Sequence, residues 1–211
     1  MAQNRSSAVM QQRSEPHDSL DDFPTPPWAT RALCQHLQDG PECIALGDMI
    51  CREPAANRGH MVAPLREYFA RVEASDVHDY GAGFEQRDYL FGLDPEPVDF
   101  TITNPPFRLA EEFIIRMRRT STVGCAVIVR SAFLEGVGRY RRLFSVAPPS
   151  LILQFSERVV MHKGRLSQGG STATAYAWLV WLTGFYGTEL RWIAPCRSAL
   201  ELSADYATEA A

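Results

Sequence analysis

The chain has 211 residues, of which 45% are hydrophobic and 22% are charged, and this balance predicts one soluble globular domain. It contains no apolar run of the roughly 18 residues that span a bilayer, and its formal net charge of −4 excludes a uniformly basic surface for nucleic acid. Five cysteines, an odd number without zinc-ligand spacing, predict a reduced, cytoplasmic protein with no bound metal.

The first 22 residues are polar and lack the apolar core of a secretion signal, so we expect a disordered arm followed by a single domain over residues 23–211. Beyond the arm, candidate strands and helices alternate, which predicts an α/β fold with a doubly wound sheet. Strands are predicted at 48–53, 72–76, 98–103, 123–130, 150–157 and 171–182, and helices at 62–72, 109–119 and 133–144.

Candidate ligand-binding residues lie at strand ends, since loops at the carboxyl ends of strands hold the ligands in such sheets. Glu53 ends the first strand and is followed by small residues, then by Asn57 and Gly59, which allow the backbone to approach a ligand closely. Asp76 follows about 20 residues later, where a carboxylate can accept both hydrogen bonds of a ribose diol. Asp88 is a third acidic residue of this kind. The alternatives are a plain connecting turn for the first loop and a solvated carboxylate for Asp88.

The stretch Asn104-Pro105-Pro106-Phe107 separates a predicted strand from a predicted helix. Two prolines fix two φ angles and remove two backbone donors, so the loop is rigid and its carbonyls point outward. The amide oxygen of Asn104 and a proline carbonyl give two acceptors on one edge, as needed to hold an exocyclic NH₂ by both hydrogens. The ring of Phe107 can stack on the base that carries the amine. A helix-entry turn, the alternative, explains the prolines but not Asn104 beside Phe107.

These four residues match the (Asp/Asn/Ser)-Pro-Pro-(aromatic) motif of the S-adenosylmethionine-dependent amino methyltransferases, and the chain most resembles the N6-adenine DNA methyltransferases. Residues 23–30 resemble the segment that closes over the methionine end of the cofactor, and residues 53–61 resemble the cofactor loop. Asp76 resembles the ribose-binding acid, and Asp88 with Tyr89 resembles the pair that contacts the cofactor's adenine. The segment order is similar to the gamma arrangement of small phage and prophage enzymes. The resemblance extends from residue 23 to about residue 182.

The resemblance implies a Rossmann-like class I methyltransferase fold: a seven-stranded, mostly parallel sheet with an antiparallel C-terminal hairpin and helices on both faces. It implies one catalytic domain over residues 23–211, with no separate target-recognition domain, and S-adenosylmethionine as cofactor. The implied catalytic residues are Asn104, Pro105, Pro106 and Phe107. The implied cofactor-binding residues are Thr25, Pro26, Pro27, Trp28, Glu53, Pro54, Ala55, Asn57, Gly59, Asp76, Asp88, Tyr89 and Asn104.

The chain departs from the family at Asn57, which stands where the cofactor loop usually has its first glycine. Asparagine adopts positive φ more readily than other residues with a side chain, so the turn can form. Its side chain, however, takes up space near the cofactor. This departure favours one alternative in particular, a methyltransferase-derived binding protein without turnover.

The implied reaction is direct in-line methyl transfer to the N6 amine of an adenine flipped out of DNA, and backbone contacts must offset the cost of flipping. Residues 162–172 are Gly-rich and basic, which predicts a mobile loop that contacts phosphates. The candidate nucleic-acid-binding residues are Arg130, Arg139, Arg158, Lys163 and Arg165, with Arg141 and Arg142 equally explained by a solvated helix face.

Specificity would come from this loop, from residues 131–144 or from residues 190–202, and we expect a short or degenerate target site. Two other substrates use the same edge of acceptors. One is the guanine N2 amine of ribosomal RNA, and the other is the side-chain amide of a protein glutamine, whose enzymes usually carry Tyr where this chain has Phe107.

Overall fold

The computed structural model describes residues 21–209, without the side chains of residues 208 and 209. Most of the expected N-terminal arm lies outside the described residues. Its last two residues, Asp21 and Asp22, are described, and both accept hydrogen bonds from loops of the domain.

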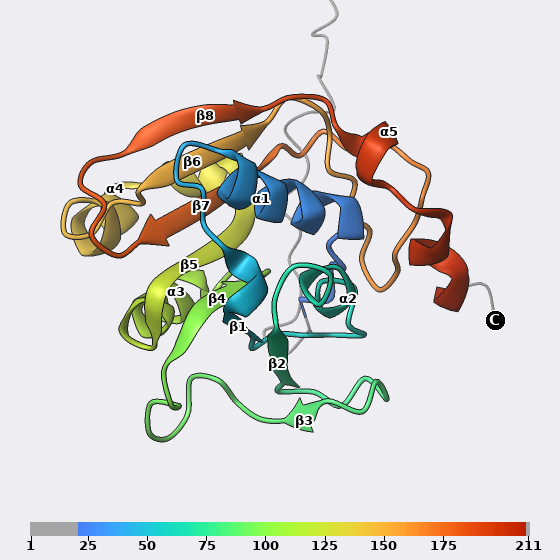
Figure 1. Cartoon of the computed structure of the whole chain (residues 1–211), viewed down its shortest axis with the longest axis horizontal. Helices are drawn as coiled ribbons and strands as arrows, with labels where there is room; N and C mark the ends of the chain where they lie inside the picture. Colours follow the sequence, from blue (N-terminus) through green and yellow to red (C-terminus); the bar gives the residue numbers. More distant parts are fainter. Residues whose placement is uncertain (1–20, 210–211) are drawn as a thin grey trace, which may run out of the picture.

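One eight-stranded sheet forms the centre of the molecule, in the order β3-β2-β1-β4-β5-β7-β6-β8 (Figure 1). β1 is parallel to β2 and β4, β2 is parallel to β3, and β4 is parallel to β5. β7 is antiparallel to both of its neighbours, β5 and β6. The expected α/β class and the antiparallel pair of late strands are therefore confirmed. The bounds are β1 (Ile50–Glu53), β2 (Arg71–Asp76), β3 (Glu85–Gln86), β4 (Val98–Thr103), β5 (Ser121–Arg130), β6 (Leu151–Phe155), β7 (Tyr176–Leu182) and β8 (Glu189–Ile193).

The expectation of seven strands is wrong, because the sheet has eight. The additional strand, β8, is parallel to β6 and forms an edge of the sheet. A search for apolar runs does not find it, since only Ile193 of its five residues is buried, while Leu190 and Trp192 are exposed.

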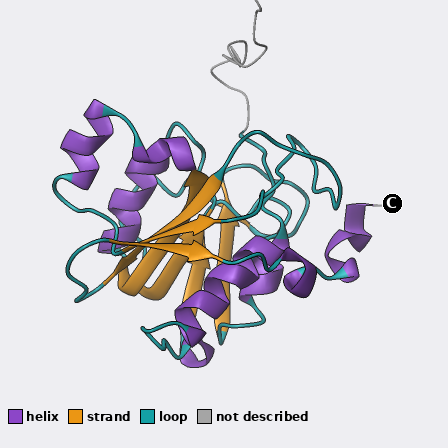
Figure 2. Ribbon diagram, turned by 90° about the horizontal axis from the view of Figure 1, so that it is seen from above, coloured by secondary structure: helices purple, strands orange, loops and turns teal. Residues whose placement is uncertain are grey.

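Helices cover both faces of the sheet (Figure 2). Side chains alternate along the central strands and fill a separate core on each face. Phe100, Ile128 and Trp178 belong to the core that includes α1, whereas Val127 and Leu179 belong to the core that includes α3. Within residues 21–209, no helix combines the length and the apolarity needed to cross a bilayer. The helices are α1 (Pro27–Asp39), α2 (Val62–Leu65), α3 (Ala110–Arg119), α4 (Val137–Arg139) and α5 (Arg197–Leu200).

The helix α1 was not among the predicted helices. Proline is nevertheless suited to the first position of a helix, where its missing N–H would have no partner within the helix, and Pro27 takes that position. The helix is fixed to the sheet by a hydrogen bond of 3.0 Å from the Trp178 indole N–H to the Ala29 carbonyl. Trp28 is only 1% exposed.

Two predicted helices are shorter than expected. The helix predicted over 62–72 ends at Leu65. It could not extend to residue 72, because β2 begins at Arg71. The helix predicted over 133–144 is interrupted at Gly136, whose φ is +121°. It is replaced by a 3-10 turn at residues 131–134, α4, and one π-helical turn at residues 140–144.

Candidate active site

The carboxyl ends of β1, β2 and β4 border an open cleft with an empty volume of about 890 Å³. β1 and β4 are neighbours at the point where the strand order reverses, which is where open α/β sheets bind their ligands. Within residues 21–209, no group of three or more His, Cys, Asp or Glu side chains is arranged to hold a metal ion. Of the expected cofactor residues, Thr25, Pro54, Ala55, Asn57, Asp76, Asp88, Tyr89 and Asn104 line the cleft, whereas Pro26, Pro27, Trp28, Glu53 and Gly59 lie behind its surface.

Glu53, at the end of β1, is fully buried. Its Oε1 accepts hydrogen bonds from the Ala55 N–H at 2.9 Å and from the Thr103 hydroxyl at 2.5 Å. Burial raises the pKa of Glu53 to about 8, and the hydrogen bonds from Thr103 and Ala55 only partly oppose that rise. The Oε2 atom of Glu53 and the buried hydroxyl of Thr25 have no hydrogen-bond partner among residues 21–209. Thr25 lines the cleft, so its hydroxyl is available to a ligand, whereas Glu53 lies behind the cleft surface.

Asn57 has φ of +51°, so it adopts the left-handed conformation in place of the usual glycine. Its backbone N–H donates to Asp76 Oδ2 at 2.8 Å, which joins the loop after β1 to the end of β2. Its side-chain amide donates to Asp22 Oδ1 at 2.7 Å. Gly59 follows with φ of +90°, and a Cβ there would lie 2.9 Å from the ring of Phe84. Glycine is thus required at residue 59 but not at residue 57.

Asp88 and Tyr89 form a wall of the cleft after β3. Asp88 is exposed, and its Oδ1 accepts the Leu90 N–H at 2.9 Å, which shapes the turn. Tyr89 is buried, with its hydroxyl 3.1 Å from the Thr120 hydroxyl and its ring 5.1 Å from that of Phe113. The tyrosine therefore presents its ring to the cleft, while its hydroxyl is held in the core.

The amide of Asn104 has a defined orientation at the end of β4. Its Nδ2 donates to the Phe23 carbonyl at 2.9 Å, which leaves Oδ1 as the group available for a ligand. Pro106 lines the cleft beside it, whereas Pro105 and Phe107 do not. The Phe107 N–H donates to Asp21 Oδ2 at 2.8 Å, so both ends of this four-residue loop are held by the same short segment.

That segment, residues 21–23, is here called the N-terminal strap. Besides its bonds to Asn104 and Phe107, it accepts the Asn57 amide on Asp22 and the Gly164 N–H on the Asp22 carbonyl, the latter at 2.8 Å. It therefore joins the loop after β1, the loop after β4 and the basic loop. Sequence reasoning missed these contacts, since they link positions up to 142 residues apart. The only signal was an acidic pair directly before a segment already assigned to the site.

Tyr80 is a second cleft residue that sequence reasoning missed. The Arg58 guanidinium lies over its ring, 5.0 Å from the centroid. Burial raises the pKa of Tyr80 to about 12, so its hydroxyl remains protonated at neutral pH. The other cleft residues without an assigned role in the sequence are Asp21, Phe23, Pro24, Ala56, His60, Met61, Val77, Leu109 and Phe113.

The five basic candidates differ in how they are held. Arg130 is exposed, and its guanidinium lies over the Phe107 ring, 4.2 Å from the centroid. Arg139 is engaged inside the fold, where its Nη1 donates to the Phe133 and Glu135 carbonyls, both at 2.7 Å. The other three, Arg158, Lys163 and Arg165, are exposed.

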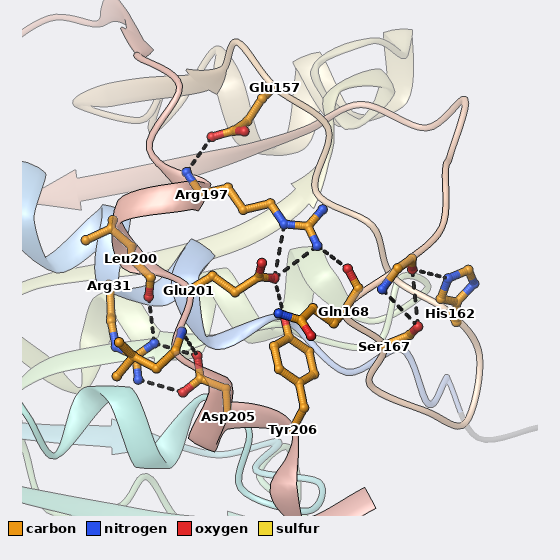
Figure 3. A network of polar contacts seen from close by, with 12 residues as sticks. Arg31, Glu157, His162, Ser167, Gln168, Arg197, Leu200, Glu201, Asp205 and Tyr206 are labelled. Carbon is orange, nitrogen blue, oxygen red and sulfur yellow. Dashed lines mark hydrogen bonds and ion pairs between the residues drawn. The ribbon is translucent and has the colours of Figure 1, made fainter. Parts of the chain in front are cut away.

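The basic loop, residues 162–172, is anchored by the C-terminal segment (Figure 3). Arg197 of α5 donates to the Gln168 carbonyl and also pairs with Glu201. Asp205, further along, accepts a bidentate hydrogen bond from Arg31 of α1 at 2.7 and 2.8 Å. The C-terminal residues therefore link the middle of this loop to the core.

No family model matches the chain, and no curated protein matches it. Its fold is similar to several solved structures. One is a modification subunit of a proposed type I restriction enzyme from Vibrio vulnificus, with 15% identity over 85% of this chain and 49% of that one and a TM-score of 0.57. Another is the methyltransferase subunit of a type I restriction-modification system from Streptococcus thermophilus, with 9% identity over 81% of this chain and 48% of that one and a TM-score of 0.59.

A third is a proposed RNA methyltransferase from Pyrococcus horikoshii, with 14% identity over 79% of this chain and 90% of that one and a TM-score of 0.55. The chain spans about half the length of the first two proteins. At these identities the similarity establishes the Rossmann-like class I methyltransferase fold.

Proposed function

We propose that the protein is an S-adenosylmethionine-dependent methyltransferase that methylates the N6 amine of adenine in DNA. The observation that carries this proposal is the fixed orientation of the Asn104 amide at the cleft. Because its nitrogen is used by the Phe23 carbonyl, its oxygen is the atom left to accept an N–H of a substrate amine. The carbonyl of Pro105, the next residue, is the second acceptor.

The residues around the cleft fit S-adenosylmethionine. Asp76 is suited to the two ribose hydroxyls, and Asp88 with Tyr89 to the adenine. The Thr25 hydroxyl, which lines the cleft and has no partner among the described residues, is suited to the amino acid end of the molecule, and Glu53 supports this end of the cleft from behind.

The chemistry requires little more than positioning from the protein. When bound, S-adenosylmethionine supplies a methyl group that is already activated by its sulfonium. Asn104 Oδ1 and the Pro105 carbonyl hold the amine by its two hydrogens, which directs the nitrogen lone pair and stabilises the positive charge that develops on that nitrogen. One amine proton then leaves to solvent, so the site needs no strong base.

DNA is the substrate that we favour. Two of the similar structures are subunits of restriction-modification systems, and the exposed Arg158, Lys163 and Arg165 give this side of the molecule cations for phosphates. We infer a small enzyme of the phage or prophage type, with one catalytic domain over residues 23–211, acting in the cytoplasm. A flipped adenine would be held between the loop after β4 and the basic loop.

Transfer of tritiated methyl groups tests the substrate. The protein is incubated with labelled cofactor and, separately, with unmethylated DNA, with RNA and with a protein extract, and the labelled product is hydrolysed and identified. We expect label in DNA as N6-methyladenine. Label found only in RNA as N2-methylguanine, or only in protein as methylglutamine, would contradict the DNA assignment. Calorimetry tests the cofactor, and absence of binding at millimolar S-adenosylmethionine would leave a binding protein without turnover.

A further inference from the structure

Arg130 and Arg139 both lie over a phenylalanine ring, but only one is otherwise held. The Arg139 guanidinium is 3.9 Å from the centroid of Phe133 and also donates to two backbone carbonyls. The Arg130 guanidinium is 4.2 Å from the centroid of Phe107. Among residues 21–209, the side chain of Arg130 has no ion pair and no hydrogen bond. It is exposed, so only the ring contact holds its side chain in this position.

Phe107 itself is held firmly. Its backbone N–H is bound by Asp21, and the ring of Phe23 flanks it at 5.6 Å with a tilt of 44°. The tilted ring leaves no parallel stacking partner on that side. The flat guanidinium of Arg130 covers the Phe107 ring, which is a surface on which a flat group can stack.

A flipped base needs the same place. Stacking of a nucleic-acid base on an aromatic side chain is a stronger contact than an exposed cation–π pair, so an arriving base can displace Arg130. The released guanidinium is then next to the strand that delivered the base, where a phosphate offers it a bidentate partner.

We propose that Arg130 is a placeholder for the target base: it covers the Phe107 ring while no base is bound and exchanges this ring for a backbone phosphate when a base arrives. The inference rests on the proposed function. It assigns two successive contacts to Arg130, and it explains why an exposed arginine lies over a ring of the catalytic loop.

Binding of single strands tests the exchange without knowledge of the target sequence. The probes are a fluorescent 12-residue oligo(dA) and an abasic 12-mer with the same phosphates, each measured by anisotropy with S-adenosylhomocysteine present so that no transfer occurs. The ratio of the two affinities isolates the contribution of the bases. In Arg130→Met this ratio should rise roughly two- to five-fold, the equivalent of about 0.4 to 1 kcal/mol at about 1.4 kcal/mol per tenfold.

The affinity for the abasic strand tests the phosphate contact separately. Affinity for the abasic strand should fall in Arg130→Met, with a salt dependence reduced by about one phosphate, and should be retained in Arg130→Lys. The matched control is Arg158→Met, which removes another exposed arginine. It should weaken both probes equally and leave the ratio unchanged.

Phe107→Ala separates the two ways in which the idea can fail. If this variant lowers the ratio but Arg130→Met does not raise it, bases do stack on Phe107 and only the placeholder is overturned. If the wild-type ratio is near one and Phe107→Ala leaves it so, no base stacks there, and the proposed function itself is contradicted.

Discussion

Asn57 holds a turn that a glycine usually provides, and it does so with its side chain directed to the N-terminal strap rather than into the cleft. The backbone N–H of this residue binds Asp76, while its amide binds Asp22. We therefore propose that its side chain lies outside the region that the ribose would occupy. At this position the replacement of glycine adds a link between the loop after β1 and the N-terminal strap.

Replacement of Asn57 tests this interpretation. Asn57→Gly keeps the positive φ and removes the side-chain bonds to Asp22 and Arg58 but not the backbone bond to Asp76, so S-adenosylmethionine affinity should stay within about threefold. Asn57→Ala places a strained residue at φ of +51° and should lower the free energy of unfolding by about 1–2 kcal/mol. Calorimetric titration and urea denaturation measure the two effects. A tenfold gain in affinity in Asn57→Gly would show that the asparagine does obstruct the cofactor.

Glu53 predicts a particular dependence of stability on pH. Its carboxyl has a pKa of about 8 in the folded protein, against an ordinary value of 4.5, because burial disfavours the charged form. The folded state therefore binds the extra proton between these values, and stability must fall as the pH rises from about 4.5 to about 8. Below the lower value both states are protonated, and the effect of pH through this group disappears.

Glu53→Gln removes that ionisation, since glutamine resembles the protonated carboxyl. The melting temperature of the variant should fall less than that of the wild type between pH 6 and pH 9, and each ~1 kcal/mol corresponds to roughly 2–4 °C in a chain of this size. Scanning calorimetry at the two pH values measures the difference. Glu112→Gln, at an exposed position of α3, is the control. Equal pH dependence in wild type and Glu53→Gln would refute the assignment.

At the level of elements, β5 lies so close to its two neighbouring strands at Gly124 that a side chain has no room there. A Cβ at this position would lie 2.7 Å from the Trp181 carbonyl oxygen on β7 and 2.9 Å from the Phe100 ring on β4. Gly124→Ala should therefore lower the free energy of unfolding by about 1–3 kcal/mol. Denaturation with urea measures it, with Gly47→Ala as the control because nothing lies within 4 Å of a Cβ there. A loss in the variant no larger than in the control would mean that β5 can shift.

The elements also show what a sequence can reveal. β4 coincides with its prediction, and β5 extends its own by two residues. Apolar residues alternate with polar ones along β4, whereas β5 is nearly continuous in buried apolar residues. β8 could not be predicted, because an edge strand with one buried residue has no apolar period. The helix over 62–72 was predicted too long, because its end is fixed by the need to begin β2 and not by its own residues.

For the molecule as a whole, the site depends on segments that are distant in the chain and meet at one end of the sheet. Loops after β1, β2 and β4 could be predicted, because each follows a strand and carries residues with recognisable chemistry. The N-terminal strap could not, since its role consists of hydrogen bonds to loops that only the folded chain brings within reach. Arg139 illustrates the converse: its type suggested a phosphate contact, but the fold uses it to bind carbonyls.

The central claim is that the Asn104 amide oxygen holds the amine that is methylated. The most direct measurement is N6-methyladenine formed in unmethylated DNA by the wild type and by Asn104→Ala, with S-adenosylmethionine affinity determined for both by calorimetry. We predict that the wild type forms the product and that Asn104→Ala loses at least about 100-fold in rate, in line with removal of one preorganised group that stabilises charge. Cofactor affinity should stay within about threefold. Methylation by Asn104→Ala at the wild-type rate would contradict the account.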